Sequence, residues 1–385
     1  MTPARPARGS SEGQLHTMAS APKSAVPAFT TKEQPGENWS GPLIDSGLLP
    51  DFLLRWGIRR ICAARLRGEA ALGEAGEPRR RLMAELAAGP IAVRTDAANA
   101  QHYEVPAEFF EQVLGARMKY SCGYWPEGVR ALDASEAAML ALTAERARIS
   151  GRQDILELGC GWGSLTLYLA ERWPDCRITA VSNSGAQKQY IDARAGERGL
   201  RNINVRTADM NGFNPGEQFD RIVSVEMFEH MRNYPLLLER ISQWMRPEAL
   251  LFVHIFSHRR FAYPYEARSP NDWMARHFFT GGMMPSDDLL PGLDAHVRCL
   301  ERWRLDGTHY QRTARAWLDR LDEHRRGALV ILARAYGPAE AGRWLERWRI
   351  FFMACEEMFG YRGGAEWGVS HYLFGKTRLE PRARQ

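Results

Sequence analysis

Short apolar segments alternate with helical segments from Asp154 to Phe256, and this alternation constrains the fold more than any other feature. The segments DILELGCG, RITAVSNS, INVRTAD, FDRIVSVEM and ALLFVHIF have the length and composition of buried strands. Helical patterns such as SLTLYLAERW and AQKQYIDARAGERG separate most of them. Strands that alternate with helices form βαβ units, in which the strands run parallel and helices cover both faces. The sequence therefore predicts a doubly wound α/β fold with a mostly parallel sheet.

The regions on either side of this alternation predict the domain organisation. Residues 1–35 are rich in Pro, Ala, Ser, Arg and Thr without apolar periodicity, which predicts a disordered leader. A transit peptide and a true start at Met18 are open alternatives. Residues 36–125 predict a helical N-terminal extension that ends in an aromatic loop. Residues 126–385 predict the main domain, with a helical cap inserted at about 257–360 and an edge strand at 367–377.

Composition excludes several classes of partner. The net charge of +5 comes from arginines spread along the chain without a basic stripe, so nucleic acid is not expected as a partner. The six cysteines form no CxxC pair and no metal-ligand spacing with histidine, which predicts reduced thiols, a cytoplasmic location and no metal site. The longest apolar runs fall short of the roughly 20 residues that a membrane-spanning helix needs. A homodimer is left open.

A glycine-rich loop, ELGCGWGS (157–164), follows the first expected strand and opens the first helix. In open α/β sheets the ligand binds at the carboxyl ends of the strands, where glycines let the backbone approach it closely. The glycines alternate as Gly159-x-Gly161-x-Gly163, and Ser164 stands where a dinucleotide fingerprint requires glycine. The loop therefore predicts a ligand other than a dinucleotide, against the alternative of a tight turn that binds nothing.

The glycine loop, together with Ala208 and Asp209 after the third strand, resembles S-adenosylmethionine-dependent methyltransferases. One departure is SNSGAQ after the second strand, where most such enzymes have an acid. This segment, KYSCGYW (119–125) and MFEH (227–230) are similar to the cyclopropane fatty acid synthase family. The segments NSGAQKQYI, EMFEHMRNY, WRIFF and EWGVSHYLFGK are most similar to the coclaurine N-methyltransferases, over roughly residues 96–377.

The resemblance implies a Rossmann-like class I methyltransferase fold with S-adenosyl-L-methionine as the cofactor. It also implies that the aromatic loop at the end of the N-terminal extension covers the cofactor. The residues that it assigns to the cofactor site are Tyr120, Ser121, Gly159, Gly161, Asn183, Gln187, Asp209, Met210 and Val225.

The stretch VSVEMFEHM (223–231) brings titratable residues to the end of an apolar strand. If a helix begins at Glu226, then Glu226, Glu229 and His230 share one face. A carboxylate attracts a cationic amine, and a histidine with a pKa near neutrality can accept its proton. The alternative is structural, because acids in a first helical turn offset the helix dipole by about 0.3 to 1 kcal/mol. The resemblance to coclaurine N-methyltransferases implies that these three residues are catalytic and that the substrate is a small amine.

The cyclopropane synthases offer a second function, methyl transfer to an unsaturated phospholipid chain. The resemblance implies that they hold a bicarbonate ion with a Cys, a Glu, a His and a late Tyr. Cys122, Glu229 and His254 match this set, whereas Phe351 and Phe352 stand where the Tyr is expected. A buried anion needs its hydrogen-bond donors, so the missing hydroxyl weakens this alternative.

Glu226 favours the amine, because cyclopropane synthases usually have Gly at this position. His254 argues mildly for the lipid, since the plant amine enzymes have Glu there. Cys355 matches a cysteine that is assigned to the active site of cyclopropane synthases, although a small buried residue on an apolar helix also fits a structural role. A third alternative is a non-catalytic, cofactor-binding scaffold. The sequence favours a methyltransferase that acts on a small amine.

Overall fold

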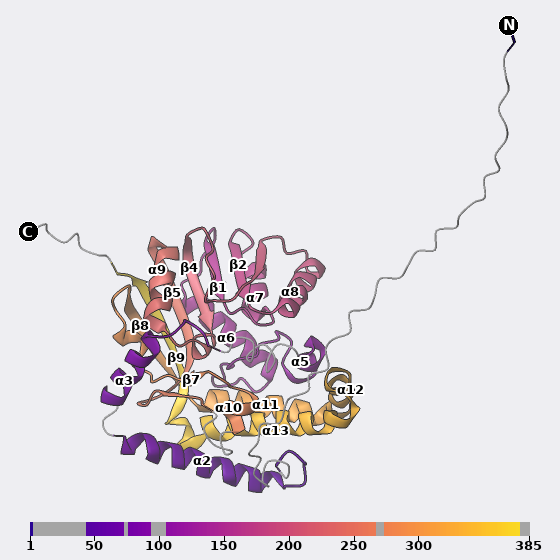
Figure 1. Cartoon of the computed structure of the whole chain (residues 1–385), viewed down its shortest axis with the longest axis vertical. Coiled ribbons are helices and arrows are strands. Elements are labelled where there is room, and N and C mark those ends of the chain that lie inside the picture. The colour runs from indigo at the N-terminus through magenta and orange to yellow at the C-terminus, as the bar shows by residue number, and fades with distance from the viewer. Residues whose placement is uncertain (3–43, 73–75, 94–104, 267–272, 378–385) are drawn as a thin grey trace, which may run out of the picture. The chain divides into compact units, whose positions relative to one another are not determined.

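The structure is a computed structural model that describes residues 1–2, 44–72, 76–93, 105–266 and 273–377. Every element named below lies in the compact unit Gln34–Gln385 (Figure 1). Apart from Met1 and Thr2, the predicted leader 1–35 lies outside the described residues, and so does the proposed start at Met18.

Seven strands form one sheet in the order β3-β2-β1-β4-β5-β9-β8. The first five strands in sequence pair in parallel, and β9 runs antiparallel to both β5 and β8. The mostly parallel α/β fold predicted from the sequence is therefore confirmed. The bounds are β1 Asp154–Leu158, β2 Arg177–Ser182, β3 Ile203–Thr207, β4 Phe219–Val225, β5 Met245–His258, β8 Val297–Asp306 and β9 Trp367–Lys376.

Helices cover both faces of the sheet, because neighbouring residues of a strand point to opposite sides. Ile222 of β4 packs in the cluster that contains Leu237 and Ile241 of α9. Val223, the next residue, packs in the cluster that contains Leu140 of α6 and Leu165 of α7. The sheet is therefore buried on both faces. The bounds of the covering helices are α6 Leu132–Arg146, α7 Ser164–Arg172, α8 Gly185–Glu197 and α9 Tyr234–Trp244.

The N-terminal extension and the cap are mostly helical. In Figure 1, α11 and α13 lie side by side beyond one end of the sheet, with α2 on the far side of α13. Arg55 of α2 is paired with Glu356 and Glu357 of α13, at 2.8 Å in each case. The helices are α2 Asp51–Ala71, α3 Gly76–Ala87, α5 Ala107–Val113, α10 Trp273–His277, α11 Thr308–Glu323, α12 Arg325–Tyr336 and α13 Pro338–Phe359. Shorter elements are η2 Phe228–His230, β6 Tyr263–Pro264, β7 Met283–Met284, η3 Leu290–Gly292 and η4 Tyr361–Gly364.

One prediction about the C-terminal part was wrong. The strand predicted at 367–377 is not an edge strand, because β9 lies between β5 and β8. Its residues are buried from Trp367 to Phe374, which fits an interior strand with apolar contacts on both faces. The strand at this edge of the sheet is β8, where partly buried and exposed residues alternate over Arg298–Trp303. β8 lies within 257–360, the segment that is predicted to contain the cap.

Candidate active site

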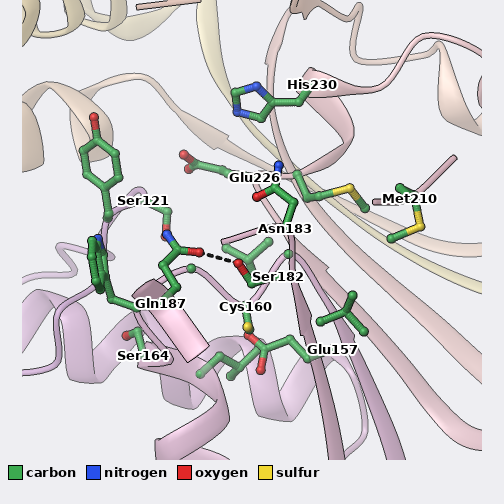
Figure 2. Close-up of a pocket in the computed structure, with 18 of the residues that line it drawn as sticks. Ser121, Glu157, Cys160, Ser164, Ser182, Asn183, Gln187, Met210, Glu226 and His230 are labelled. Carbon is green, nitrogen blue, oxygen red and sulfur yellow. Dashed lines mark hydrogen bonds between the residues drawn. The ribbon is translucent and has the colours of Figure 1, made fainter. Parts of the chain in front are cut away.

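One pocket opens at the carboxyl ends of β1 to β4 (Figure 2). The chain order of the strands reverses between β1 and β4, which is where open α/β sheets bind ligands. Glu226 and His230 line this pocket, whereas Glu229 and Cys355 do not. All the residues that the sequence assigned to the cofactor line it: Tyr120, Ser121, Gly159, Gly161, Asn183, Gln187, Asp209, Met210 and Val225.

The glycine loop turns the chain from β1 into α7 through positive φ angles. Gly159 has φ +79°, and a Cβ at this position would lie 2.6 Å from Cβ of Met227. Gly163 has φ +80°, and its Cβ would lie 2.6 Å from Cγ1 of Ile191. Gly161 has φ +52°, but a Cβ there would meet no atom within 4 Å. The outer glycines therefore permit close packing, while Gly161 leaves open space on the pocket side.

Several polar groups of the pocket are oriented for a polar ligand. Ser182 Oγ donates to Gln187 Oε1 at 2.6 Å, which orients the amide of Gln187 (Figure 2). Trp162 Nε1 and Ser164 Oγ are buried and have no hydrogen-bond partner among the described residues. A buried polar group without a partner costs about 1–3 kcal/mol, so a ligand that supplies the missing partners is favoured. The hydroxyl, amino and carboxylate groups of S-adenosylmethionine fit this lining.

Two titratable residues of the pocket were missed. Lys119 is buried and donates a hydrogen bond to Ser121 Oγ. Glu157 accepts a hydrogen bond from Thr166 Oγ1 at 2.6 Å, and burial raises the pKa of its carboxyl to about 8. The signals were present, because Glu157 opens the glycine motif and Lys119 directly precedes the segment YSC.

The acidic turn is not the helix that was predicted. Glu226 has φ +47°, in the left-handed region, and the following 3₁₀ helix contains only Phe228–His230. The Glu226 N–H donates to the carbonyl oxygen of His254 on β5 at 2.9 Å. This bond continues the β4–β5 pairing for one residue and then turns the chain away from the sheet. Glu226, Glu229 and His230 therefore do not share one helical face.

Three donors from distant segments hold the carboxylate of Glu226. Its Oε1 accepts from the Cys122 N–H at 2.9 Å and lies 3.1 Å from His254 Nε2, and its Oε2 accepts from the Tyr310 hydroxyl at 2.6 Å. The side chain is 9% exposed. Burial raises the pKa of the Glu226 carboxyl, while the charge of Lys119 and the bonds from Cys122 and Tyr310 oppose the rise. The pocket therefore contains a buried carboxyl group whose pKa is raised by burial.

Glu229 and Cys355 lie behind this carboxylate. Glu229 is fully buried, and its Oε1 accepts from the Phe256 N–H at 2.7 Å. Burial, followed by the charge of Glu226, raises the pKa of Glu229 well above its usual range. Cys355 is buried on α13, and burial raises the pKa of its thiol. Burial therefore favours the protonated form of both groups, and neither lines the pocket.

Tyr310 was also missed, because the late tyrosine was expected at positions 351–352. Phe351 stacks on Phe278 with ring centroids 4.4 Å apart, and Phe352 is fully buried in the same cluster. Tyr310 instead stands in the first turn of α11, directly after β8. The signal was its position, because a residue just after a sheet strand can reach the pocket edge. Tyr310 therefore supplies the hydroxyl group that the sequence analysis expected to be missing.

Within the described ranges, no group of three or more His, Cys, Asp and Glu side chains is placed to hold a metal ion. The six cysteines are free thiols. No helix in the part of the chain that the structure describes is long and apolar enough to cross a bilayer.

Known proteins have a similar fold and a similar sequence. A solved coclaurine N-methyltransferase, bound to N-methylheliamine and S-adenosylhomocysteine, matches with a TM-score of 0.82 and 37% identity, covering 86% of this chain and 97% of that one. The (S)-coclaurine N-methyltransferase of Thalictrum flavum subsp. glaucum is 40% identical over 290 residues, which are 74% of this chain and 80% of the relative. The cyclopropane-fatty-acyl-phospholipid synthase of Escherichia coli strain K12 is 28% identical over 222 residues, 57% of this chain and 55% of the relative.

The sheet order, the pocket beside the glycine loop and the likeness to a relative bound to S-adenosylhomocysteine define a class I S-adenosylmethionine-dependent methyltransferase. The sequence profile of the mycolic acid cyclopropane synthetase family matches residues 92–364. The chain belongs to that family. The predicted enzyme class and cofactor are confirmed.

Gly161→Ala is expected to weaken binding of S-adenosylhomocysteine at least about tenfold, because the new methyl group enters the pocket. Left-handed backbone costs a non-glycine residue about 1–2 kcal/mol, so some stability is also lost. Gly216→Ala is the matched control, since Gly216 has φ +75° and open surroundings but does not line the pocket. Calorimetric titration should show weaker binding for the first variant alone. Equal affinities would show that the ligand does not approach Gly161.

Glu157→Gln is expected to change how stability depends on pH. The folded carboxyl keeps its proton up to a pKa of about 8, whereas the unfolded one loses it above about 4.5. The wild type should therefore lose stability as the pH rises from about 4.5 to 8, by about 1.4 kcal/mol for each unit of the shift. Glutamine does not titrate, so the variant should lack this slope in urea unfolding without cofactor. Parallel curves for both proteins would contradict the buried, protonated Glu157, and Glu145→Gln serves as an exposed control.

Proposed function

We propose that this enzyme transfers a methyl group to the nitrogen of a small amine. The observation that carries the proposal is the buried carboxylate of Glu226, which lines the cofactor pocket and is held by three hydrogen-bond donors. The relatives support it, because the pavine N-methyltransferase of Thalictrum flavum subsp. glaucum is also 36% identical over 289 residues. These relatives are named for amine methylation.

An aliphatic amine presents a protonation problem that this site can solve. With a pKa near 10, the amine is mostly protonated at pH 7, and the three-unit difference costs about 4 kcal/mol. When bound, S-adenosylmethionine supplies an electrophilic methyl group, which only the neutral amine attacks. The carboxylate of Glu226 attracts the ammonium ion and can accept its proton, because burial raises the carboxyl pKa. His230, at the same pocket, is a second group that can take part in this transfer.

An aromatic wall next to His230 supports a cationic or aromatic substrate. The His230 ring lies against Phe279, with centroids 4.7 Å apart. Phe279 in turn contacts Phe256 at 5.6 Å and Tyr265 at 5.0 Å. Aromatic faces attract cations and stack on aromatic rings, so this wall suits an amine that carries apolar groups. In this proposal Glu226 and His230 are the catalytic pair, Glu229 supports the turn from behind, and Cys355 is structural.

One observation favours the second function, methyl transfer to an unsaturated phospholipid chain. The four residue types of the anion site in cyclopropane synthases are all present around Glu226, because Tyr310 supplies the hydroxyl that the sequence search missed. The carboxylate of Glu226, however, already accepts from Cys122, His254 and Tyr310. A second anion at these donors would be repelled by this carboxylate. The amine is therefore the better substrate class.

Labelled S-adenosylmethionine and two panels of acceptors test the proposal. Purified enzyme is incubated with primary and secondary amines that carry aromatic groups, and separately with vesicles of unsaturated phospholipid. We expect label to enter amines. Label that enters only phospholipid would overturn the proposal in favour of the second function, and no transfer to either panel would favour a cofactor-binding scaffold. The six free thiols support the prediction of a reducing, cytoplasmic location, which cell fractionation can test.

A further inference from the structure

A line of hydrogen bonds runs from the pocket through the sheet to α6. Glu226 Oε1 lies 3.1 Å from His254 Nε2, and His254 Nδ1 lies 2.9 Å from His371 Nε2. His371 Nδ1 in turn lies 2.8 Å from Nη1 of Arg146, the last residue of α6. His254 and His371 face each other across the antiparallel pair β5 and β9. The line therefore joins four segments that are far apart in the sequence.

Arg146 determines the direction of every hydrogen bond in this line. A guanidinium group only donates, so His371 Nδ1 must accept from it. His371 then carries its proton on Nε2 and donates to His254 Nδ1. His254, for the same reason, carries its proton on Nε2 and donates to Glu226 Oε1. Both rings have one proton and one lone pair, and a single donor at the far end sets the tautomer of both.

Both rings are neutral, so the line does not pair Glu226 with a cation. His254 and His371 are fully buried. Burial lowers the pKa of each ring well below its usual value, and the nearby charge of Arg146 lowers it further. Glu226 thus receives a hydrogen bond from His254 without losing its negative charge. That charge stays available to a substrate cation.

Packing holds Arg146 and His371 in place. Arg146 is half-buried and lies over the ring of Trp303 on β8, with its guanidinium carbon 4.9 Å from the ring centroid. The ring of His371 meets Phe252 edge to face at 5.2 Å. A guanidinium stacked on an aromatic ring loses little further freedom when it donates a hydrogen bond. The arrangement is therefore preorganised before any substrate binds.

We propose that Arg146 and His371 are positioning residues that hold His254 as a donor to Glu226 and thereby keep Glu226 deprotonated and directed at the substrate. This rests on the proposed function, in which Glu226 acts on an amine. Without the Arg146 donor the line can take up one proton from solvent at His371 Nδ1 and reverse, so that each ring carries its proton on Nδ1 and a protonated Glu226 donates to His254 Nε2. A reversed line removes the charge that attracts the ammonium ion and the site that accepts its proton.

Other titratable groups also face Glu226, and they are unchanged when Arg146 is replaced. They are Lys119 and Cys122 from the covering loop, Glu229 and His230 from η2, Tyr310 from α11 and Cys355 from α13. The histidine pair faces Lys119 and Arg146. A pH effect that follows substitution of Arg146 therefore reports on the hydrogen-bonded line and on the charge of Arg146, and Arg146→Lys, which keeps the charge, is included for this reason.

Arg146→Met is compared with Arg146→Lys and with Arg148→Met. A wrong histidine tautomer costs up to about 10⁴ in kcat in serine proteases, and through two rings we expect a loss of about tenfold. The acid limb of the kcat–pH profile should move to higher pH, because the reversed line favours protonated Glu226. Lysine keeps a donor and should restore much of the activity. Arg148 is exposed and paired with Glu301, so its substitution should leave turnover unchanged.

A second measurement does not depend on turnover. Nuclear magnetic resonance of protein labelled with ¹⁵N-histidine, saturated with S-adenosylhomocysteine, reports which ring nitrogen carries the proton. We expect the Nε2–H tautomer for His254 and His371 in the wild type and a mixture in Arg146→Met. An unchanged tautomer in that variant, or an unshifted pH profile in an enzyme that methylates amines, would overturn the inference. A wild type that methylates no amine refutes the proposed function instead, and the tautomers still decide what Arg146 does.

Discussion

Glu226→Gly is expected to lower kcat for methyl transfer to an amine by about 10² to 10⁴, the range for loss of a general base. The substitution removes the buried carboxylate and leaves the Cys122 amide, His254 and the Tyr310 hydroxyl without their acceptor. The fold should persist, because φ at Glu226 is +47°, which glycine adopts without strain. Initial rates measure turnover, and calorimetric titration with S-adenosylhomocysteine measures cofactor affinity. Cofactor affinity should be retained while turnover falls.

Arg152→Gly is the matched control for this experiment. Arg152 also has a positive φ of +62°, but it does not line the pocket. The same relief of backbone strain there should leave turnover at the wild-type level. If Glu226→Gly turns over amine as fast as this control, Glu226 has only a structural role and the proposed catalytic pair is wrong.

Gly307→Ala is expected to destabilise the protein by about 3 kcal/mol or more, the upper range for overpacking. Gly307 links β8 to α11, and its N–H donates to the Gly364 carbonyl at 2.9 Å. A Cβ there would enter the van der Waals radii of the carbonyl oxygens of Phe359 and Trp367, which are backbone atoms and yield little. Three residues later stands Tyr310, so turnover should fall as well. Urea unfolding measures the loss of stability, and initial rates measure the loss of turnover.

Gly342→Ala provides the control of opposite sign. Gly342 is exposed on α13, and a Cβ there meets no atom within 4 Å. Alanine in a helix interior is more favourable than glycine by about 0.5–1 kcal/mol, so this variant should be more stable. Equal stability of the two variants would mean that the junction at Gly307 can relax around a methyl group.

The half of the pocket beside the glycine loop was predictable because its signals are local. In a parallel sheet the carboxyl ends of the strands meet at one edge, so residues after β1, β2, β3 and β4 converge whatever else the chain does. Gly159, Asn183, Asp209 and Val225 each follow or end a strand that the apolar pattern identified. Their common pocket follows from the order of elements alone. Glu157 has the same local signal.

The half of the site around Glu226 was less predictable because it depends on packing between remote segments. The left-handed backbone of Glu226 follows from its bond to His254 on the next strand, which no periodicity reveals. Tyr310 and His371 reach the site only because β8 and β9 join the same sheet. The sequence showed that a strand existed at β9 but placed it at the wrong position. The pairing of β9 with β5 and β8 therefore could not be predicted.

The position of β9 inside the sheet also has a consequence for the order of assembly during synthesis. β9 follows all other described elements in the chain, yet it separates β5 from β8 and supplies His371 to the line that ends at Glu226. Chains fold from the N-terminus as they emerge from the ribosome, so the glycine loop and its strands can form well before this strand exists. A nascent chain that stops before Trp367 would contain the elements of the cofactor pocket but not the complete setting of its carboxylate. During synthesis, the chain would thus become able to bind the methyl donor before it becomes able to transfer the methyl group.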